Sequence, residues 1–398
     1  MRKPILLAEE TITAGDFDRL IEWLKTYPRL TKGEQTIEFE QKWAEAMGTK
    51  YAVFVNSGSS ANLLMIYALI VQGRFKNKNL KVVVPALSWI TDIAPVMQLG
   101  LEPVLVDCNL QDLSVDINHL TYIFETEKPT CMILVPVLGL VPDMEAIAAL
   151  CKLWGVILLI DNCEGQGSRY YVKESGLEIE KVPLECFGLM TSCSTYFGHI
   201  LSTIEGGMIT TDDEELYNLL KMLRSHGWTR DIDAESKAAL QQKYNISDFN
   251  ELYTFYQPGF NLRSTDLQAF IGIMQLKRLN MVTEARNNNY RLYHNLINID
   301  CWKPANKPNT FVSNLGYPVI HHERGKIVAE LTANGVEVRP LISGSMGQQP
   351  FFIERYGRQE LPNANIVDNQ GFYLPNHPYL EMEEIEFICS IINKYTKL

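Results

Sequence analysis

Residues 57–60 (Ser-Gly-Ser-Ser) place small and hydroxyl-bearing side chains between an apolar run and a helical pattern. The free N–H groups and the dipole at the start of a helix attract a phosphate, and small residues let it approach the backbone. Gly58 and Ser59 are therefore candidate phosphate-binding residues. A serine-rich helix start that binds no ligand has the same pattern, so this segment alone leaves both interpretations open.

A second segment, residues 161–164 (Asp-Asn-Cys-Glu), follows the apolar run 156–160. The carboxylate of Asp161 can pair with a protonated heterocyclic nitrogen. It can equally cap the turn that follows the run, because aspartate readily accepts hydrogen bonds from nearby backbone N–H groups. The local pattern leaves both roles open.

A third segment, residues 192–209, contains a hydroxyl cluster that includes Ser194, then His199, then a Glu-Gly-Gly turn that begins at Glu205. The ordinary pKa of imidazole, about 6.5, suits proton transfer near neutral pH. A lone histidine is more often structural than catalytic. The role of His199 therefore depends on the segments around it.

The elements that position these segments alternate between short apolar runs and helical patterns from residue 51 to about residue 211. Continuous Val, Ile and Leu runs indicate strands that are covered on both faces, and strand–helix alternation indicates a mostly parallel sheet with helices on both sides. Ligands bind such sheets beyond the carboxyl ends of the strands, where all three segments fall. The predicted strands are 51–55, 81–85, 104–106, 132–135 and 156–160, and the predicted helices among them are 61–71 and 92–98.

The pattern changes past about residue 258. A long helix is predicted over 265–296 with a break near Asn280, followed by a strand over 311–319 and helices over 324–333 and 383–395. We therefore predict an α/β fold with a large domain over residues 1–258, which carries the three segments, and a smaller α+β C-terminal domain over residues 259–398.

The composition excludes several classes of protein. A formal net charge of −11 argues against a nucleic-acid-binding surface, because affinity for the phosphate backbone depends on clustered Lys and Arg. No run reaches the roughly 18 apolar residues of a membrane span, and the N-terminus lacks the apolar core of a signal peptide. The eight cysteines form no Cys-x-x-Cys pair, so neither a zinc site nor a disulfide framework is expected. We predict a cytoplasmic protein with no nucleic-acid or membrane partner and no metal.

Taken in this order, the segments resemble the sugar-aminotransferase family of fold type I pyridoxal-phosphate enzymes, and the resemblance covers most of the chain. It implies a cofactor, pyridoxal 5′-phosphate (PLP) or pyridoxamine 5′-phosphate (PMP), whose phosphate is held by Gly58, Ser59 and Ser194. It further implies that Trp89 stacks on the pyridine ring and that Asp161 pairs with the ring nitrogen.

The resemblance also extends to Glu164 and Asn261. Glu164 stands where aminotransferases of the family usually carry glutamine, which implies a place near the ring face or the ring hydroxyl. Residues 259–263 (Gly-Phe-Asn-Leu-Arg) resemble a family motif whose asparagine reaches the phosphate in the neighbouring subunit. Asn261 therefore implies a homodimer with shared active sites.

One position departs from the family's pattern. The lysine that bonds to the cofactor stands six residues before the glutamate of the Glu-Gly-Gly turn, and counting back from Glu205 leads to His199. Imidazole cannot form that bond, but it can still move protons. The resemblance thus implies a cofactor held without a covalent bond, resting as PMP, with His199 as the catalytic base.

Such an enzyme is expected to be a nucleotide-sugar 3-dehydratase. The amine of PMP condenses with a 4-keto-6-deoxyhexose, the hydroxyl at C3 is expelled, ammonia is released, and L-glutamate restores PMP. Two alternatives are an aminotransferase-like enzyme of another outcome and a non-catalytic relative that keeps the fold.

Residues 226–230 (His-Gly-Trp-Thr-Arg) and 339–344 (Arg-Pro-Leu-Ile-Ser-Gly) resemble the branch of the family that acts on GDP-linked sugars. His226, Arg230 and Arg339 are therefore candidate substrate-binding residues, since arginine suits bidentate contacts with diphosphate or carboxylate. A surface salt bridge explains a single arginine equally well.

Another branch of the family that carries histidine in place of the lysine also holds an iron–sulphur cluster. That cluster needs several cysteine ligands after the histidine, and only Cys301 and Cys389 follow His199. No iron–sulphur cluster is expected.

Overall fold

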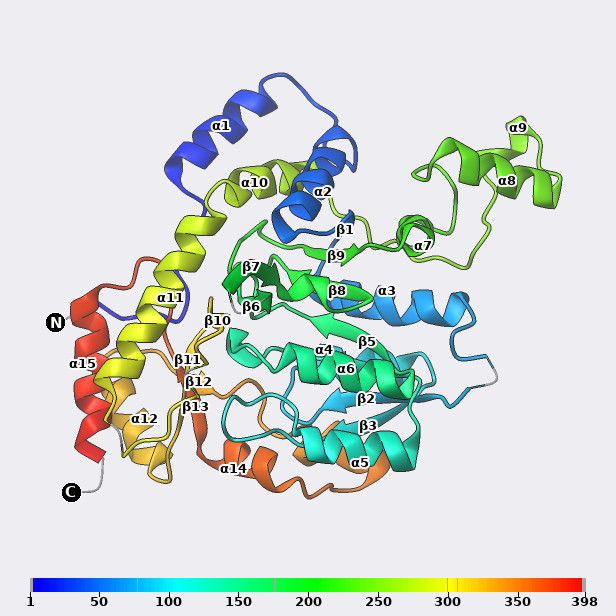
Figure 1. Ribbon diagram of the computed structural model, residues 1–398. Helices are drawn as coiled ribbons and strands as arrows, with labels where there is room; N and C mark the ends of the chain where they lie inside the picture. Colours follow the sequence, from blue (N-terminus) through cyan, green and yellow to red (C-terminus); the bar gives the residue numbers. More distant parts are fainter. Residues whose placement is uncertain (1–2, 77, 175–176, 299, 306, 396–398) are drawn as a thin grey trace.

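The computed structural model describes residues 3–395 apart from 77, 175, 176, 299 and 306, and its centre is a seven-stranded sheet (Figure 1). The strand order is β1-β9-β8-β5-β4-β2-β3. β9 runs antiparallel to both of its neighbours, whereas β8, β5, β4, β2 and β3 pair in parallel, so the predicted mostly parallel sheet is confirmed. The strands are β1 (Tyr51–Val55), β2 (Lys81–Pro85), β3 (Glu102–Val106), β4 (Cys131–Leu134), β5 (Ile157–Asp161), β8 (Met190–Ser194) and β9 (Gly207–Thr211).

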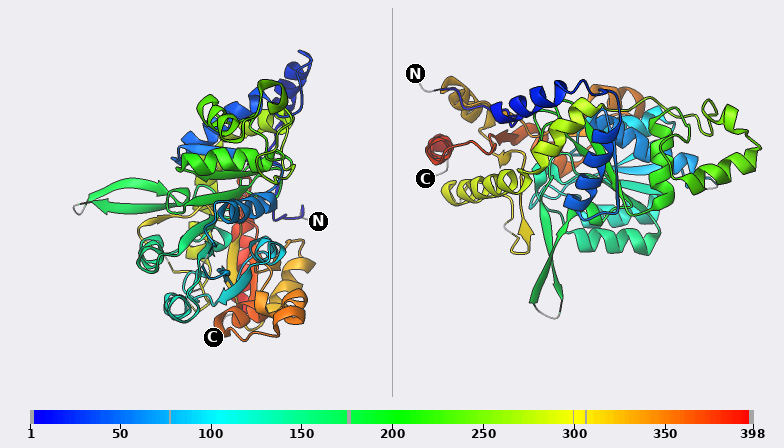
Figure 2. Two further views of the ribbon diagram at one scale, coloured as in Figure 1. Left: turned by 90° about the vertical axis from the view of Figure 1, so that its right-hand side faces the viewer. Right: turned by 90° about the horizontal axis from the view of Figure 1, so that it is seen from above.

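Helices cover the sheet because most of its strands are rich in apolar residues and must be buried on both faces, while β8 and β9 bury small polar side chains as well. α3 packs against β1, β8 and β9, and α6 packs against β5. The left view in Figure 2 shows α5 and α6 on one side of the sheet and α3 on the other. The helices next to the sheet are α3 (Gly58–Val71), α4 (Ile90–Gln98), α5 (Ile117–Glu127), α6 (Met144–Trp154) and α7 (Glu214–Arg224).

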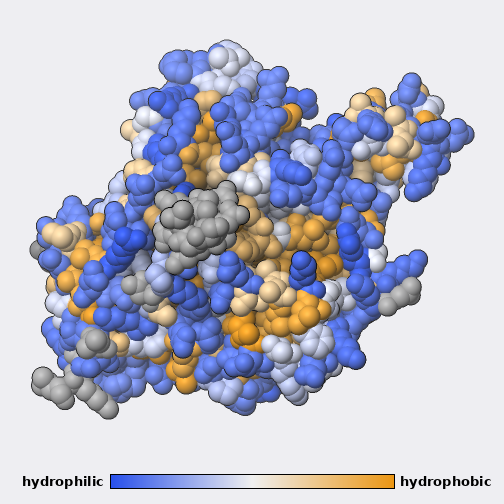
Figure 3. Space-filling view, viewed as in Figure 1, coloured by the Kyte–Doolittle hydropathy of each residue, from blue (hydrophilic) through white to orange (hydrophobic). Residues whose placement is uncertain are grey.

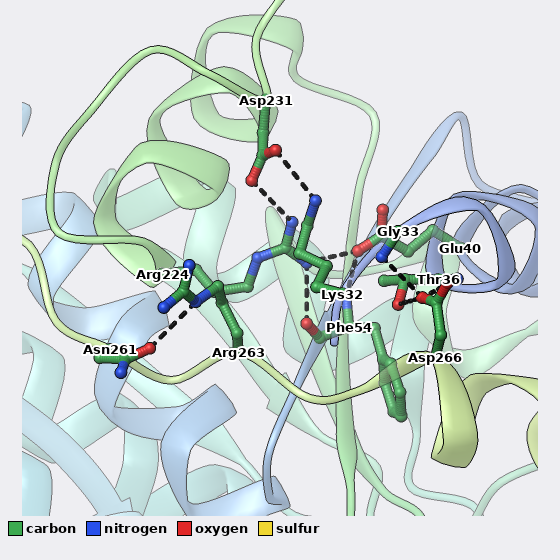
Figure 4. Close-up of polar contacts among 10 residues, drawn as sticks. All are labelled: Lys32, Gly33, Thr36, Glu40, Phe54, Arg224, Asp231, Asn261, Arg263 and Asp266. Carbon is green, nitrogen blue, oxygen red and sulfur yellow. Dashed lines mark hydrogen bonds and ion pairs between the residues drawn. The ribbon is translucent and has the colours of Figure 1, made fainter. Parts of the chain in front are cut away.

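Two buried polar contacts join α2 to the rest of the molecule (Figure 4). Asp266 accepts hydrogen bonds from the backbone N–H groups of Gly33 (2.7 Å) and Thr36 (3.0 Å), and so caps the first turn of α2. Arg224 of α7 pairs with Glu40 of α2 and donates to the carbonyl of Phe54 in β1 (2.8 Å). The helices at this end are α1 (Ala14–Leu24), α2 (Glu34–Met47), α10 (Asp266–Leu276) and α11 (Leu279–Leu296).

The break predicted near Asn280 lies between α10 and α11, at Lys277 and Arg278. The single strand predicted over 311–319 is wrong, because two strands of different sheets lie there. β10 (Thr310–Phe311) pairs with β6, and β11 (Tyr317–Ile320) pairs with β13 (Gly371–Leu374). Between them the backbone N–H of Ser313 bonds to a buried serine hydroxyl (2.9 Å) instead of to a strand.

Beside the C-terminal sheet, which has the order β11-β13-β12, α15 packs on α12 and α11, and α14 packs on β13. α10, although it follows residue 258, packs on α2. The predicted domain boundary at 258 stays a prediction. The elements here are β12 (Arg339–Pro340), α12 (Arg324–Ala333), α13 (Pro350–Tyr356), α14 (Pro362–Gln370) and α15 (Met382–Ile392).

Two segments that the sequence patterns do not predict project from the molecule (Figure 2). One is the hairpin of β6 (Arg169–Glu174) and β7 (Leu177–Pro183), and the other carries α8 (Ala234–Tyr244) and α9 (Asp248–Glu251). The face in Figure 3 is mostly hydrophilic, with hydrophobic side chains gathered over α6. Within the described residues, no helix has both the length and the apolar character that crossing a bilayer requires.

Candidate active site

A cavity of about 480 Å³ lies at the edge of the sheet where β1, β2, β5 and β8 end. Because β9 runs the opposite way, its first residue reaches this same edge, paired with Ser194 of β8 and Val55 of β1. The sheet therefore brings together segments as far apart in the sequence as Val55 and Gly207, which are 152 positions apart. Parallel strands that end at one edge are expected to do this. Seven of the predicted site residues line the cavity: Gly58, Ser59, Trp89, Asp161, Glu164, Ser194 and His199.

The N-terminus of α3 forms one corner of the cavity. The backbone N–H of Ser60 donates to Oγ of Ser57 (3.1 Å), which fixes the first turn of the helix. A β-carbon added to Gly207 would collide with the carbonyl of Ser57. The backbone at the start of β9 is therefore in direct contact with the backbone of this turn. The first N–H groups of a helix have no partner within the helix, and a phosphate is a suitable one. The corner fits the phosphate of the predicted cofactor.

Asp161 is the last residue of β5 and is only 4% exposed. Its Oδ1 accepts from the N–H of Cys163 (2.9 Å), and its Oδ2 accepts from the amide of Asn62 (2.5 Å). The predicted capping of the following turn is thus present, and the carboxylate still lines the cavity. The two predicted roles do not exclude each other, because a carboxylate can accept about four hydrogen bonds.

Glu164 lies on the wall of the cavity, and its Oε2 accepts a hydrogen bond from the N–H of Leu138 (2.6 Å). Burial raises the pKa of the Glu164 carboxyl to about 8, and the negative charge of Asp161 adds to the increase, while the Leu138 N–H opposes it. At neutral pH the carboxyl is mostly protonated and can donate a hydrogen bond.

His199 lies in the loop between β8 and β9, with its backbone N–H bonded to the carbonyl of Tyr196 (3.0 Å). Its Nδ1 is buried and has no hydrogen-bond partner among the described residues. Burial lowers the pKa of the imidazole below its ordinary value, although the charge of Asp161 opposes this. The ring is therefore neutral at pH 7 and able to accept a proton.

Trp89, at the start of α4, lines the cavity with an indole that is 52% exposed. A tryptophan that is half exposed on a concave wall offers a flat apolar face to a ring-shaped ligand. Its backbone N–H donates to Oδ2 of Asp92 (3.2 Å), which holds the tryptophan against the helix start.

Three other predicted residues lie together outside this cavity. Arg263 donates to Oδ1 of Asn261 (3.0 Å; Figure 4), and its guanidinium lies 3.4 Å from Nε2 of His226. Arg230 stacks on the Trp228 ring at 3.8 Å and donates to a backbone carbonyl. Neither Asn261 nor Arg230 contributes to the cavity of its own chain.

Arg339 is exposed and forms an ion pair with Glu337 (2.5 Å), as the alternative interpretation predicts for a surface arginine. Its register partner across the C-terminal sheet is Tyr373, which does line the cavity. The backbone of Arg339 thus lies next to a residue of the cavity wall, while its guanidinium is paired with Glu337.

The sequence patterns missed several residues that line the cavity, among them Asp92, Tyr196 and Tyr373. Asp92 could have been found from the sequence, because it is an acidic residue three positions after Trp89, in the first turn of a predicted apolar helix. No local pattern identifies Tyr373, because it belongs to a strand of the C-terminal sheet, far along the chain from the other residues of the cavity.

The sequence model of the DegT/DnrJ/EryC1/StrS aminotransferase family matches residues 11–393. The chain belongs to this family. GDP-4-keto-6-deoxy-D-mannose 3-dehydratase from Yersinia pseudotuberculosis is 33% identical to it over 374 residues, which cover 92% of each protein. GDP-perosamine synthase from Caulobacter vibrioides is 25% identical over 402 residues, which cover 98% of each. Because relatives of both names match the chain over most of its length, family membership alone does not distinguish between the two activities that these names give.

Solved structures agree with the family. A crystal structure of GDP-4-keto-6-deoxymannose-3-dehydratase with a trapped PLP–glutamate geminal diamine has a TM-score of 0.84 at 30% identity, covering 97% of this chain and 99% of that chain. The family and the fold type I architecture predicted from the sequence are confirmed.

Proposed function

We propose that this member of the family is a PMP-dependent 3-dehydratase that removes the C3 hydroxyl of GDP-4-keto-6-deoxy-D-mannose. The observation that carries the proposal is the neutral imidazole of His199, whose Nδ1 is buried, on a cavity wall to which no lysine contributes, among the residues that the structure describes. The Yersinia relative that bears this activity in its name supports the choice of reaction and of sugar.

The cofactor predicted from the resemblance, PLP or PMP, is confirmed by the family and by its solved members, one of which holds hydrated PLP. When bound, the cofactor supplies an amine that condenses with the sugar ketone and a ring that withdraws electrons from the reacting carbons. The corner at the start of α3 accepts its phosphate through Gly58, Ser59 and Ser194 in this proposal. Trp89 covers one face of the ring, and Asp161 holds the proton on the ring nitrogen.

His199 moves the protons that the reaction requires. As a neutral imidazole it accepts a proton from the methylene carbon next to the cofactor's amine. As an imidazolium it returns a proton to the hydroxyl that leaves C3, because hydroxide itself is a poor leaving group. Glu164, protonated at neutral pH, donates a hydrogen bond within the cavity and adds no second negative charge beside Asp161.

A second copy of the chain completes the site in this proposal. Asn261 and Arg230 lie outside the cavity of their own chain, which supports a role at the cavity of a partner in a homodimer. His226 lies beside them, next to Arg263. We assign recognition of the nucleotide to this surface and to Arg339, whose guanidinium must exchange Glu337 for a diphosphate in order to bind one.

The relative that is a perosamine synthase supports a second candidate, an aminotransferase acting on the same class of sugar. The lack of a lysine among the described residues of the cavity wall argues against it, because transfer of an amine uses a lysine as both anchor and proton carrier. The intact cavity, with the buried carboxyls of Asp161 and Asp92 on its wall, argues against a non-catalytic relative, since buried carboxyls are costly to keep without a use.

The test is a mass measurement of the product. Purified protein is incubated with PLP, L-glutamate and GDP-4-keto-6-deoxymannose. We expect a sugar that has lost one oxygen, together with one ammonia and one 2-oxoglutarate, so that the oxidation of glutamate balances the reduction at C3. The variant His199→Asn should bind the cofactor and lose about 10²–10⁴-fold in rate. An aminated sugar as the product would overturn the proposal.

A further inference from the structure

Two carboxyl groups lie side by side on the wall of the cavity. Asp92 of α4 is 1% exposed and Asp161 of β5 is 4% exposed, and the two side chains are within hydrogen-bonding reach of each other. Both line the cavity. The amide of Asn62, on α3, lies between them, with its Nδ2 2.5 Å from Oδ2 of Asp161 and 3.4 Å from Oδ1 of Asp92.

No cation balances this pair, because neither carboxyl has an ion-pair partner among the described residues. The other titratable groups that face it are Glu164, Cys163 and His199, and none of them is cationic when the imidazole is neutral. Burial and the charge of Asp161 raise the pKa of Asp92 well above its ordinary value. Two like charges this close in a buried site do not ionise together, so the pair carries one proton near neutral pH.

The hydrogen bonds decide which carboxyl carries the negative charge. Asp161 accepts from Asn62 at 2.5 Å and from the N–H of Cys163 at 2.9 Å. Asp92 accepts from the N–H of Trp89 at 3.2 Å and lies 3.4 Å from the same amide nitrogen, whose second proton has a nearer acceptor in the carbonyl of Thr91 at 3.2 Å. The hydroxyl of Ser192 donates to Oδ1 of Asn62, which turns the NH₂ group of the amide toward the carboxyls. Shorter bonds from donors stabilise the charged form, so the charge belongs on Asp161.

We propose that Asp92 is a positioning residue that stays protonated and donates a hydrogen bond to Asp161, to which Asn62 also donates, so that one negative charge faces the ring nitrogen of the cofactor. The inference rests on the proposed role of Asp161 toward that nitrogen. A carboxylate stabilised by three donors keeps its charge without taking the proton of the pyridinium, and the ring then retains its electron-withdrawing form.

The first test uses the protein without cofactor or substrate, so it does not depend on the proposed reaction. The unfolding temperatures of the wild type and of Asp92→Asn are compared between pH 4 and pH 8. Unfolded Asp92 releases its proton near pH 4, whereas the folded carboxyl keeps it, so the wild type loses stability as pH rises. The Asn variant donates a similar hydrogen bond and does not titrate. Its unfolding temperature relative to that of the wild type should therefore rise by about 2 °C or more between pH 4 and pH 8. A difference that does not change with pH overturns the proposal.

The second test reads the bound cofactor. PLP labelled with nitrogen-15 in the ring is added to the wild type, to Asp92→Asn and to Asp92→Leu, which matches the side chain in shape and donates nothing. At pH 7 the ring nitrogen should resonate at the pyridinium position in the first two proteins and move toward the neutral position in the Leu variant. Equal positions in all three, or a shift in the Asn variant as large as that in the Leu variant, overturn the proposal. If the Leu variant does not fold, the pH series of the Asn variant decides alone.

Discussion

A β-carbon placed on Gly58 would lie 2.8 Å from the Cβ of Ser194, so the start of α3 and the end of β8 touch at a distance that only glycine allows. The contact fixes the corner of the cavity to which we assign the phosphate. It joins two residues that are 136 positions apart and that the sequence alone relates only through the resemblance to a family.

Gly58→Ala should therefore weaken the binding of PLP. An added methyl group must push Ser194 and the first turn of α3 apart, at a cost of about 1–3 kcal/mol, which corresponds to about a fivefold to 150-fold loss of affinity. The affinity is measured by fluorescence titration of the protein with PLP. Gly325→Ala is a matched control, because a β-carbon there meets nothing within 4 Å, and its affinity should equal that of the wild type. Equal affinities for both variants would show that the phosphate lies elsewhere.

His199→Lys should create a covalent bond to the cofactor. A primary amine placed on this wall of the cavity can reach the aldehyde of PLP, which the imidazole cannot bond to. The protein is treated with PLP and borohydride, and its intact mass is measured. The variant should gain the mass of one reduced cofactor, whereas the wild type and His199→Asn should gain none. A covalent gain in the wild type would mean that some other lysine binds the cofactor.

Glu164→Gln should remove a dependence of stability on pH. In the unfolded chain this carboxyl loses its proton near pH 4.5, but in the folded protein it keeps the proton until about pH 8. The wild type is therefore destabilised relative to the Gln variant as pH rises through this window, by on the order of 1 kcal/mol for each pH unit. Urea denaturation of the apoprotein at pH 5 and pH 8 gives the two free energies of unfolding. If the free energies of unfolding of the two proteins change equally between pH 5 and pH 8, Glu164 is ionised in the folded protein.

Mixing two inactive variants should restore activity if the active site is shared between subunits. In a hybrid dimer of His199→Asn and Asn261→Ala, one site contains both changes and the other contains neither. Random exchange of subunits then gives about a quarter of the wild-type sites. Product formation is measured before and after the two proteins are unfolded and refolded together. No recovery, with hybrid dimers present by native mass spectrometry, would place Asn261 at its own chain's site or at none.

The sheet and most of the cavity could be predicted because their signals are local. Continuous apolar runs locate β1, β2, β4 and β5 to within a residue or two, and the polar residues after them then share one edge. The position of His199 could be predicted only by counting from Glu205 within the resemblance to the family. The local pattern alone left it as a lone histidine.

The rest could not be predicted because it depends on contacts between distant segments. Residues 311–319 begin and end with apolar side chains that are common in strands, yet β10 and β11 join different sheets. Tyr373 enters the cavity from a strand more than 160 residues beyond β9. Asn261 and Arg230 have motifs typical of the family, but a single chain does not show where those side chains act.

The reversed direction of β9 has a consequence for how this scaffold changes its chemistry. Residues 195–206 leave the sheet from β8 and return to it through the very next strand, so both ends of that loop are anchored to one rigid frame. Replacing the side chain at 199 leaves each anchor untouched. Under the proposed function, one substitution at this position would exchange a tethering amine for a free proton carrier while both anchors of the loop stay in place.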